Sequence, residues 1–403
     1  MAEHAGKPKV RFAGFTEDWE QRKLGEIADK VTEKNTTLRY TEALTNSAEF
    51  GIIGQRDFFD HDVAKLSSLH GYYIVKEDDF VYNPRISVTA PVGPVNRNKL
   101  GKIGVVSPLY TVLRTAQIDN EFLEWFFKSA CWHSFMIFNG DSGARSDRFS
   151  IKNSTFFEMP IPCPCRMEQV RIGTFFRHLD RLITLHQRKR GRLENIKKAM
   201  LEKMFPKNGA DVPEIRFAGF TEAWEQRKLG DLAEFNPKAE LPTNFEYVDL
   251  ESVVGTELIN HRTQTKCTAP SRAQRLAQYG DLFYQLVRPY QKNNYLFELN
   301  SENFVFSTGY AQLRPSVDGY FLMSLVQNEY FVQKVLDNCT GTSYPAINVN
   351  DLAEINIYTS LKKSEQARIG TFFRQLDRLV TLHQRKVTLL QNIKKACLEK
   401  MFV

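Results

Sequence analysis

The feature that most constrains the fold is a 38-residue segment that occurs twice. Residues 168–205 and 365–402 are identical at 30 of their 38 aligned positions, and neither copy contains proline. Apolar residues recur every seven positions in both copies, a spacing typical of a long helix that packs against another helix. Each copy is therefore predicted to form a helix of roughly 55 Å, and the most obvious partner of each helix is the other copy.

The heptads also predict which side chains pack between the two helices. These are Ile172, Leu179, Leu182, His186, Leu193 and Ile196 in the first copy, and Ile369, Leu376, Leu379, His383, Leu390 and Ile393 in the second. The two histidines occupy equivalent positions. The simplest interpretation is a satisfied polar residue, and the alternatives are a residue that fixes helix register or a pH switch.

A second duplication shows that the whole chain repeats one plan. Residues 11–28 and 216–233 are identical at 15 of 18 positions, so each half consists of an opening motif, a globular stretch and a long helix. The globular stretches have diverged, yet each contains a capped helix, with Asp119 and Asp318 as the predicted N-caps. The predicted class is α+β: two similar α/β-mixed domains joined by two long antiparallel coiled-coil helices, with a pseudo-two-fold internal repeat. The predicted boundaries are 1–163, 164–206, 207–362 and 363–403.

Composition narrows the class of protein. The net charge of +7 mildly favours a polyanionic partner. The amino terminus lacks the apolar region of a signal peptide, and no run of about 18 apolar residues occurs, so neither export nor a membrane span is expected. The six cysteines show neither metal-site nor disulfide-framework spacing, which favours a reducing cytoplasm and no metal site.

Motifs of catalysis are absent from the sequence. It contains no phosphate-binding loop, no dinucleotide-binding glycine motif, no GxSxG nucleophile turn and no HExxH zinc motif. Asn83-Pro84-Arg85 matches only part of the Asn-Pro-Pro-aromatic loop of amino-methyltransferases, and a strand followed by a turn explains it better. These absences make an enzyme the least favoured class for this chain.

Loops rich in arginine, amide and hydroxyl side chains are the candidates for recognition. Arginine can read guanine and amides can read adenine, whereas serine, threonine and lysine hold phosphates. For any single residue a solvated surface loop is the simpler interpretation, but the set as a whole favours DNA recognition. The candidates are Arg85, Ser87, Ser142, Arg145, Arg148 and Lys152 in the first half, and Gln285, Arg288, Tyr290, Lys292, Thr342, Ser343, Tyr344 and Asn348 in the second.

The sequence resembles the specificity (S) subunit of type I restriction–modification systems along essentially its whole length. The resemblance rests on three motifs: F-x-G-F-x-x-x-W-E-x-x-x-L-G at 12–25 and 217–230, the helix motif at 168–189 and 365–386, and G-T-S-Y-P-A-I-N-x-x-D-L at 341–352. The first half departs from the third motif, because residues 140–145 read GDSGAR instead.

The resemblance implies a non-catalytic, cytoplasmic DNA-binding subunit without a cofactor of its own. Each globular stretch would be a target recognition domain that reads one half of a bipartite, asymmetric site in double-stranded DNA. The helices would be conserved spacers that dock two modification subunits, which carry S-adenosylmethionine and methylate adenine N6. Restriction subunits that use ATP and Mg²⁺ would complete the complex. The alternative is a two-domain protein-assembly scaffold with no DNA readout.

Overall fold

The computed structural model describes residues 4–59, 66–141, 147–207, 209–341 and 343–402. Its internal contacts divide the chain into two compact units. The first unit comprises residues 1–185 and 386–403, and the second comprises residues 186–385. Each unit contains one domain of mixed helix and sheet and part of each long helix, as expected for the α+β class with an internal repeat. The separation of each long helix as a domain of its own stays a prediction.

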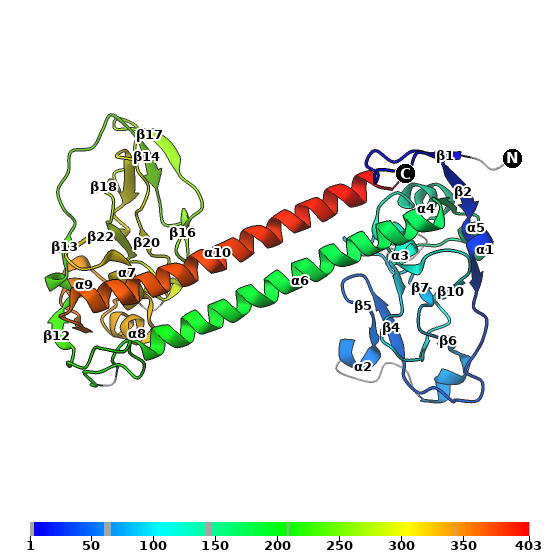
Figure 1. Cartoon of the computed structure of the whole chain (residues 1–403), viewed down its shortest axis with the longest axis horizontal. Coiled ribbons are helices and arrows are strands. Elements are labelled where there is room, and N and C mark those ends of the chain that lie inside the picture. Colours follow the sequence, from blue (N-terminus) through cyan, green and yellow to red (C-terminus); the bar gives the residue numbers. More distant parts are fainter. Residues whose placement is uncertain (1–3, 60–65, 142–146, 208, 342, 403) are drawn as a thin grey trace. The chain divides into compact units, whose positions relative to one another are not determined.

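The two predicted long helices are present. Helix α6 (Arg166–Lys203) and helix α10 (Lys363–Lys400) have 38 residues each. They pack side by side and run in opposite directions (Figure 1). Two ion pairs at equivalent positions of the repeat join them: Asp180 with Lys394 at 2.6 Å, and Asp377 with Lys197 at 2.5 Å. Because the two helices have nearly identical sequences, the same aspartate–lysine ion pair forms at two equivalent positions.

The seam between the long helices differs in part from the predicted one. Leu182, Ile196, Leu379 and Ile393 are 36–42% exposed, so the prediction that they pack in the seam is wrong. The buried side chains lie four residues after the first predicted seam position of a heptad, not three. They include Phe176, Ile183, Phe373 and Val387. Since an α-helix has 3.6 residues per turn, both positions flank the same face, and heptad spacing alone does not choose between them.

The remaining predicted seam residues lie on the packed face. Ile172, Leu179, Ile369 and Leu376 are buried, and Leu193 and Leu390 pack partly buried against the domain cores. The Nδ1 atoms of His186 and His383 are 2.8 Å apart. In this contact one imidazole nitrogen donates and the other accepts. This polar contact favours a single register of the helices.

An antiparallel four-stranded sheet forms the centre of the first domain. Its strand order is β3 (Ala28–Lys30), β10 (Thr111–Thr115), β7 (Phe80–Tyr82) and β8 (Val95–Arg97). A smaller sheet of three strands contains β1 (His4–Gly6), β2 (Trp19–Lys23) and β11 (Pro160–Cys163). Two further sheets have two strands each: β4 (Leu44–Ser47) with β5 (Gly51–Gly54), and β6 (Tyr73–Val75) with β9 (Gly104–Val106). The shorter helices are α1 (Leu24–Ile27), α2 (Gln55–Phe58), η1 (Leu66–Gly71), α3 (Asn120–Lys128), α4 (His133–Asn139) and α5 (Asn153–Phe157).

The second domain repeats the central sheet of the first. Its strand order is β13 (Ala233–Phe235), β22 (Tyr310–Pro315), β19 (Leu282–Gln285) and β20 (Tyr295–Leu296). A further sheet has the strand order β17 (Arg262–Thr265), β14 (Asn244–Val248), β21 (Phe304–Ser307) and β18 (Ala273–Leu276). Two antiparallel pairs are also present: β12 (Glu225–Lys228) with β23 (Asn356–Thr359), which are far apart in the sequence, and the hairpin β15 (Val253–Val254) with β16 (Glu257–Leu258). The shorter helices are η2 (Leu229–Asp231), η3 (Pro289–Gln291), α7 (Gly319–Gln327), α8 (Glu329–Asp337) and α9 (Val349–Ala353).

Two capped helices fasten the domains to the long helices. The carboxylate of Asp119 accepts a hydrogen bond from the backbone of α3, and that of Asp318 does the same in α7, which confirms both predicted N-caps. Gly173 of α6 lies against the first turn of α3, where an added Cβ would be 2.7 Å from the Cβ of Glu121. Gly370 of α10 lies in the same way against the cap of α7. Glycine therefore sits where the long helices meet the capped helix ends.

Candidate nucleic-acid interface

Two arginines from different loops lie opposite one another: Arg85 follows β7, and Arg148 lies between α4 and α5. Arg85 and Arg148 form an isolated antiparallel bridge, and on one side of it the Ile86 N–H donates to the Asp147 carbonyl at 3.0 Å. Residues in such a pair without mutual hydrogen bonds have their side chains on the same face and close together. Among the residues that the structure describes, neither guanidinium has a carboxylate partner. Like charges placed directly opposite repel each other, so this position is suited to an anion.

The second domain builds the same backbone arrangement with different side chains. Val287 and Ala346 form the equivalent bridge. The Arg288 N–H donates to the Pro345 carbonyl at 2.7 Å on one side of it. Valine and alanine thus occupy the positions of Arg85 and Arg148. We call this backbone arrangement, in which two loops pair at one bridge, the paired-loop frame. The two domains offer different chemistry at the same position.

Three predicted contact residues of the second domain already have protein partners. Gln285 is 3% exposed, and its amide donates to the side chain of Gln291 at 3.0 Å, so it braces its own loop. Lys292 pairs with Glu329 at 2.7 Å. Asn348 caps α9, where its side chain accepts from the backbone. These groups are less available to a ligand than their residue types suggest.

Other predicted residues are accessible. Tyr290 is 49% and Tyr344 is 64% exposed, and the guanidinium carbon of Arg288 lies 4.5 Å from the centre of the Tyr344 ring. The side chains of Ser87, Lys152 and Ser343 are exposed, and Lys152 has no ion pair among the described residues. The Ser87 hydroxyl accepts from the Ala90 backbone at 3.2 Å. Ser142, Arg145 and Thr342 lie outside the residues that the structure describes.

A hollow of about 500 Å³ adjoins Arg85 and Ser87 in the first domain. Its wall includes Thr45 and Ser47 of β4 and Asn83 at the end of β7. Sequence reasoning missed Thr45 and Ser47, since they lie about forty residues before Arg85 and carry no motif. The folding of β4 beside β7 brings them to the site, where Asn83 donates to the Asn46 carbonyl at 2.8 Å.

Two buried ion pairs anchor the duplicated opening motifs. Sequence reasoning missed these pairs as well. Arg11 binds Glu168 through two hydrogen bonds of 2.7 Å, and Arg216 binds Glu365 at 2.6 and 2.9 Å. Both carboxylates have no exposed surface. The hydrogen bond to Glu365 raises the pKa of the Arg216 guanidinium above its ordinary value. Each pair ties an opening motif to the start of a long helix; the only sequence signal is that both partners lie in duplicated segments.

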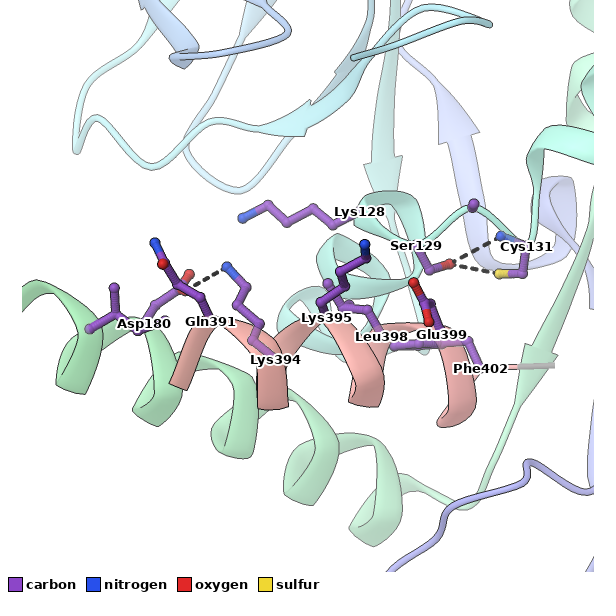
Figure 2. A pocket seen from close by; sticks show the side chains of 12 residues that line it. Lys128, Ser129, Cys131, Asp180, Gln391, Lys394, Lys395, Leu398, Glu399 and Phe402 are labelled. Carbon is purple, nitrogen blue, oxygen red and sulfur yellow. Dashed lines mark hydrogen bonds and ion pairs between the residues drawn. The ribbon is translucent and has the colours of Figure 1, made fainter. Parts of the chain in front are cut away.

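A separate pocket lies in the first unit between the end of α3 and parts of α6 and α10. Its volume is about 690 Å³, and Figure 2 shows Lys128, Lys394 and Lys395 around it. Lys394 pairs with Asp180 at 2.6 Å, and burial raises the pKa of the Cys131 thiol to about 11. No residue predicted to contact DNA lines this pocket.

Two kinds of feature are absent from the residues that the structure describes. None of the helices there is both long and apolar enough to span a membrane. No group of three or more histidine, cysteine, aspartate or glutamate side chains in those residues is arranged to hold a metal ion.

Comparison with known proteins identifies the class. Residues 16–195 and 221–392 match the family model of the type I restriction modification DNA specificity domain. Because these two matches cover most of the chain, the chain belongs to this family.

Individual relatives agree with that family. The chain is similar to the type I restriction enzyme HindI specificity subunit of Haemophilus influenzae, with 23% identity over 195 residues, which is 45% of this chain and 41% of that protein. The match thus spans less than half the length of that relative. The fold is similar to that of the type I restriction–modification S subunit from M. genitalium, with 15% identity, a TM-score of 0.56 and coverage of 98% of this chain and 99% of that one. A chain from a structure on complex assembly and conformational transition of the type I R-M system has a TM-score of 0.50 at 16% identity, over 96% of this chain and 98% of that one.

Proposed function

We propose that this chain is the non-catalytic DNA-recognition subunit of a type I restriction–modification complex, in which each domain reads one half of a bipartite, asymmetric site. The supporting observation is the paired-loop frame common to both domains. It presents Arg85 and Arg148 in one domain and Val287 and Ala346 in the other. Domains that share one backbone frame but differ in its side chains are suited to bind the same ligand, double-stranded DNA, through different contacts.

Salt-dependent DNA binding tests this proposal directly. The chain, assembled with its modification partner, should bind duplex DNA at about 50 mM salt, and its affinity should fall steeply as salt rises, because bound phosphates release counterions. Fluorescence anisotropy on a labelled duplex measures both effects. Absence of binding at low salt in the presence of the partner would favour the protein-assembly scaffold instead.

We further propose that the long helices have two tasks. They fix the spacer between the half-sites, and they dock two modification subunits that carry S-adenosylmethionine; restriction subunits with ATP and Mg²⁺ complete the complex. The supporting observation is a pair of exposed leucines in each repeat, Leu182 with Leu185 and Leu379 with Leu382, which are 42–46% exposed. Exposed apolar side chains in clusters are typical of interaction sites. Two equivalent surfaces can bind two identical partners.

Replacing Leu182 and Leu185 with glutamate should remove one of the two modification subunits. Charged residues at the centre of an apolar contact typically cost at least about 2 kcal/mol, or roughly 30-fold in affinity. Native mass spectrometry of the assembled complex should show one partner copy in place of two. The equivalent variant at Leu379 and Leu382 should give the same result.

The matched control replaces the exposed Gln187 with glutamate, which adds negative charge to the same helix without touching the leucines. That variant should keep both partner copies. Retention of both copies by the leucine variant would exclude this surface as the docking site.

A further inference from the structure

The loop between β19 and β20 has an unusual backbone. Arg288 has φ 55° and ψ 55°, and Lys292 has φ 56° and ψ 30°, so both residues adopt the left-handed conformation that favours glycine. A strained, non-glycine backbone persists only where the surrounding structure determines it, and such positions concentrate at functional sites. The contacts that hold this loop therefore indicate what it positions.

Buried side chains fix the loop from inside. Asn294 is 1% exposed, and its carbonyl oxygen accepts from the Gln285 N–H at 2.8 Å. The amide of Gln327 donates to the Lys292 carbonyl at 3.0 Å. The Arg288 N–H donates to the Pro345 carbonyl, which ties this loop to the segment that contains Tyr344. The direction in which the Arg288 side chain leaves the backbone is thus set by the fold.

Tyr344 holds the Arg288 side chain, but no carboxylate of the described residues neutralises its charge. Its guanidinium lies over the ring of Tyr344, whose own side chain is largely exposed. Lys292 of the same loop pairs with Glu329, whereas Arg288 has no carboxylate partner among the described residues. A cation–π contact of this kind uses none of the guanidinium N–H groups as a hydrogen-bond donor to a carboxylate, so they remain able to donate to a ligand.

We propose that Arg288 determines specificity by reading one guanine in the half-site of the second domain, with Tyr344 as its positioning residue. This inference rests on the proposed function. The two N–H groups of the guanidinium edge donate to guanine O6 and N7 in the major groove, an arrangement that needs an oriented fork. Adenine presents a donor beside its N7, and a guanidinium has no acceptor to match it. The same fork can also bind a phosphate, and the experiment below separates the two contacts.

The test uses the full chain assembled with its modification subunits. Methylation mapping first defines the site, and each guanine of the second half-site is then replaced singly by 7-deazaguanine, which removes the N7 acceptor and keeps base pairing. The wild-type complex should lose about 5- to 150-fold in affinity at one guanine. Arg288→Ala should lose a similar factor on unmodified DNA and lose nothing further from that 7-deazaguanine.

Variants of Tyr344 separate positioning from charge. Tyr344→Phe keeps the ring and should keep guanine discrimination. Tyr344→Ala should lower discrimination at the same base pair and leave the first half-site unaffected. A thermal unfolding curve close to that of the wild type establishes that each variant is folded.

Three outcomes would overturn the inference: a second half-site without guanine, a 7-deazaguanine effect that persists in Arg288→Ala, or an equal loss on all sequences, which would make Arg288 a phosphate contact. Failure of the proposed function itself looks different, because the wild-type complex would then prefer no duplex over any other.

Discussion

Replacement of Glu365 by alanine should lower the free energy of unfolding of the second unit by about 3 kcal/mol. The Glu365 carboxylate is fully buried and accepts two hydrogen bonds from Arg216, whose side chain is 11% exposed. Without it, a largely buried guanidinium loses its counter-charge, and breaking a buried pair costs far more than its formation contributes. The remaining exposure of Arg216 places the cost at the lower end of the usual range. Urea unfolding of the full chain, followed by tryptophan fluorescence and circular dichroism, measures the change.

The control for Glu365→Ala is Glu354→Ala. Glu354 pairs with Lys228 at 2.6 Å, but both side chains are more than half exposed. This variant has the same change of charge in the same unit, and its unfolding midpoint should stay close to that of the wild type. Equal midpoints for the two variants would mean that the buried pair does not hold the opening motif to α10.

The architecture was largely predictable because the opening motif and the long helix each occur twice in the sequence. Heptad spacing predicted both long helices, and the aspartates before the apolar runs predicted the caps of α3 and α7. The seam itself was predicted only in part: Phe176 and Phe373 are buried where Leu182 and Leu379 are not. The choice depends on how far each helix is rotated toward its partner. That rotation is set by tertiary contacts, such as those of Gly173 and Gly370 with the capped helices, which no single heptad specifies.

The candidate interface was predictable by residue type and not by arrangement. In the sequence Gln285, Lys292 and Arg288 look equally suited to contact DNA. Folding gives the first two residues protein partners and leaves Arg288 stacked on an exposed ring. Arg85 and Arg148 are far apart in the sequence, and only the pairing of their two loops makes them neighbours. Side-chain availability is a tertiary property, and it decides which members of a polar loop can bind.

Removal of both arginines of the first frame should weaken DNA binding roughly 100-fold at low salt, since each charge-assisted hydrogen bond to a phosphate contributes about a factor of ten. Arg85 and Arg148 lie opposite one another, and no described carboxylate neutralises them. A phosphate between the two guanidinium groups relieves their repulsion, so the pair is suited to the DNA backbone and not to a base edge. Arg85→Ala with Arg148→Ala should therefore lower affinity for all sequences and reduce the slope of log affinity against log salt by about two.

The matched control removes the same charge elsewhere in the first domain. Lys30 and Arg39 are exposed and lie outside the paired loops, so Lys30→Ala with Arg39→Ala should leave the slope nearly unchanged. Fluorescence anisotropy across a salt series, on a specific and a random duplex, measures both variants. If the two double variants lose the same affinity, binding depends on overall charge and the frame has no role. If the arginine variant changes base preference at the first half-site and keeps its salt slope, the pair reads bases, and the frames of the two domains differ in which bases they read.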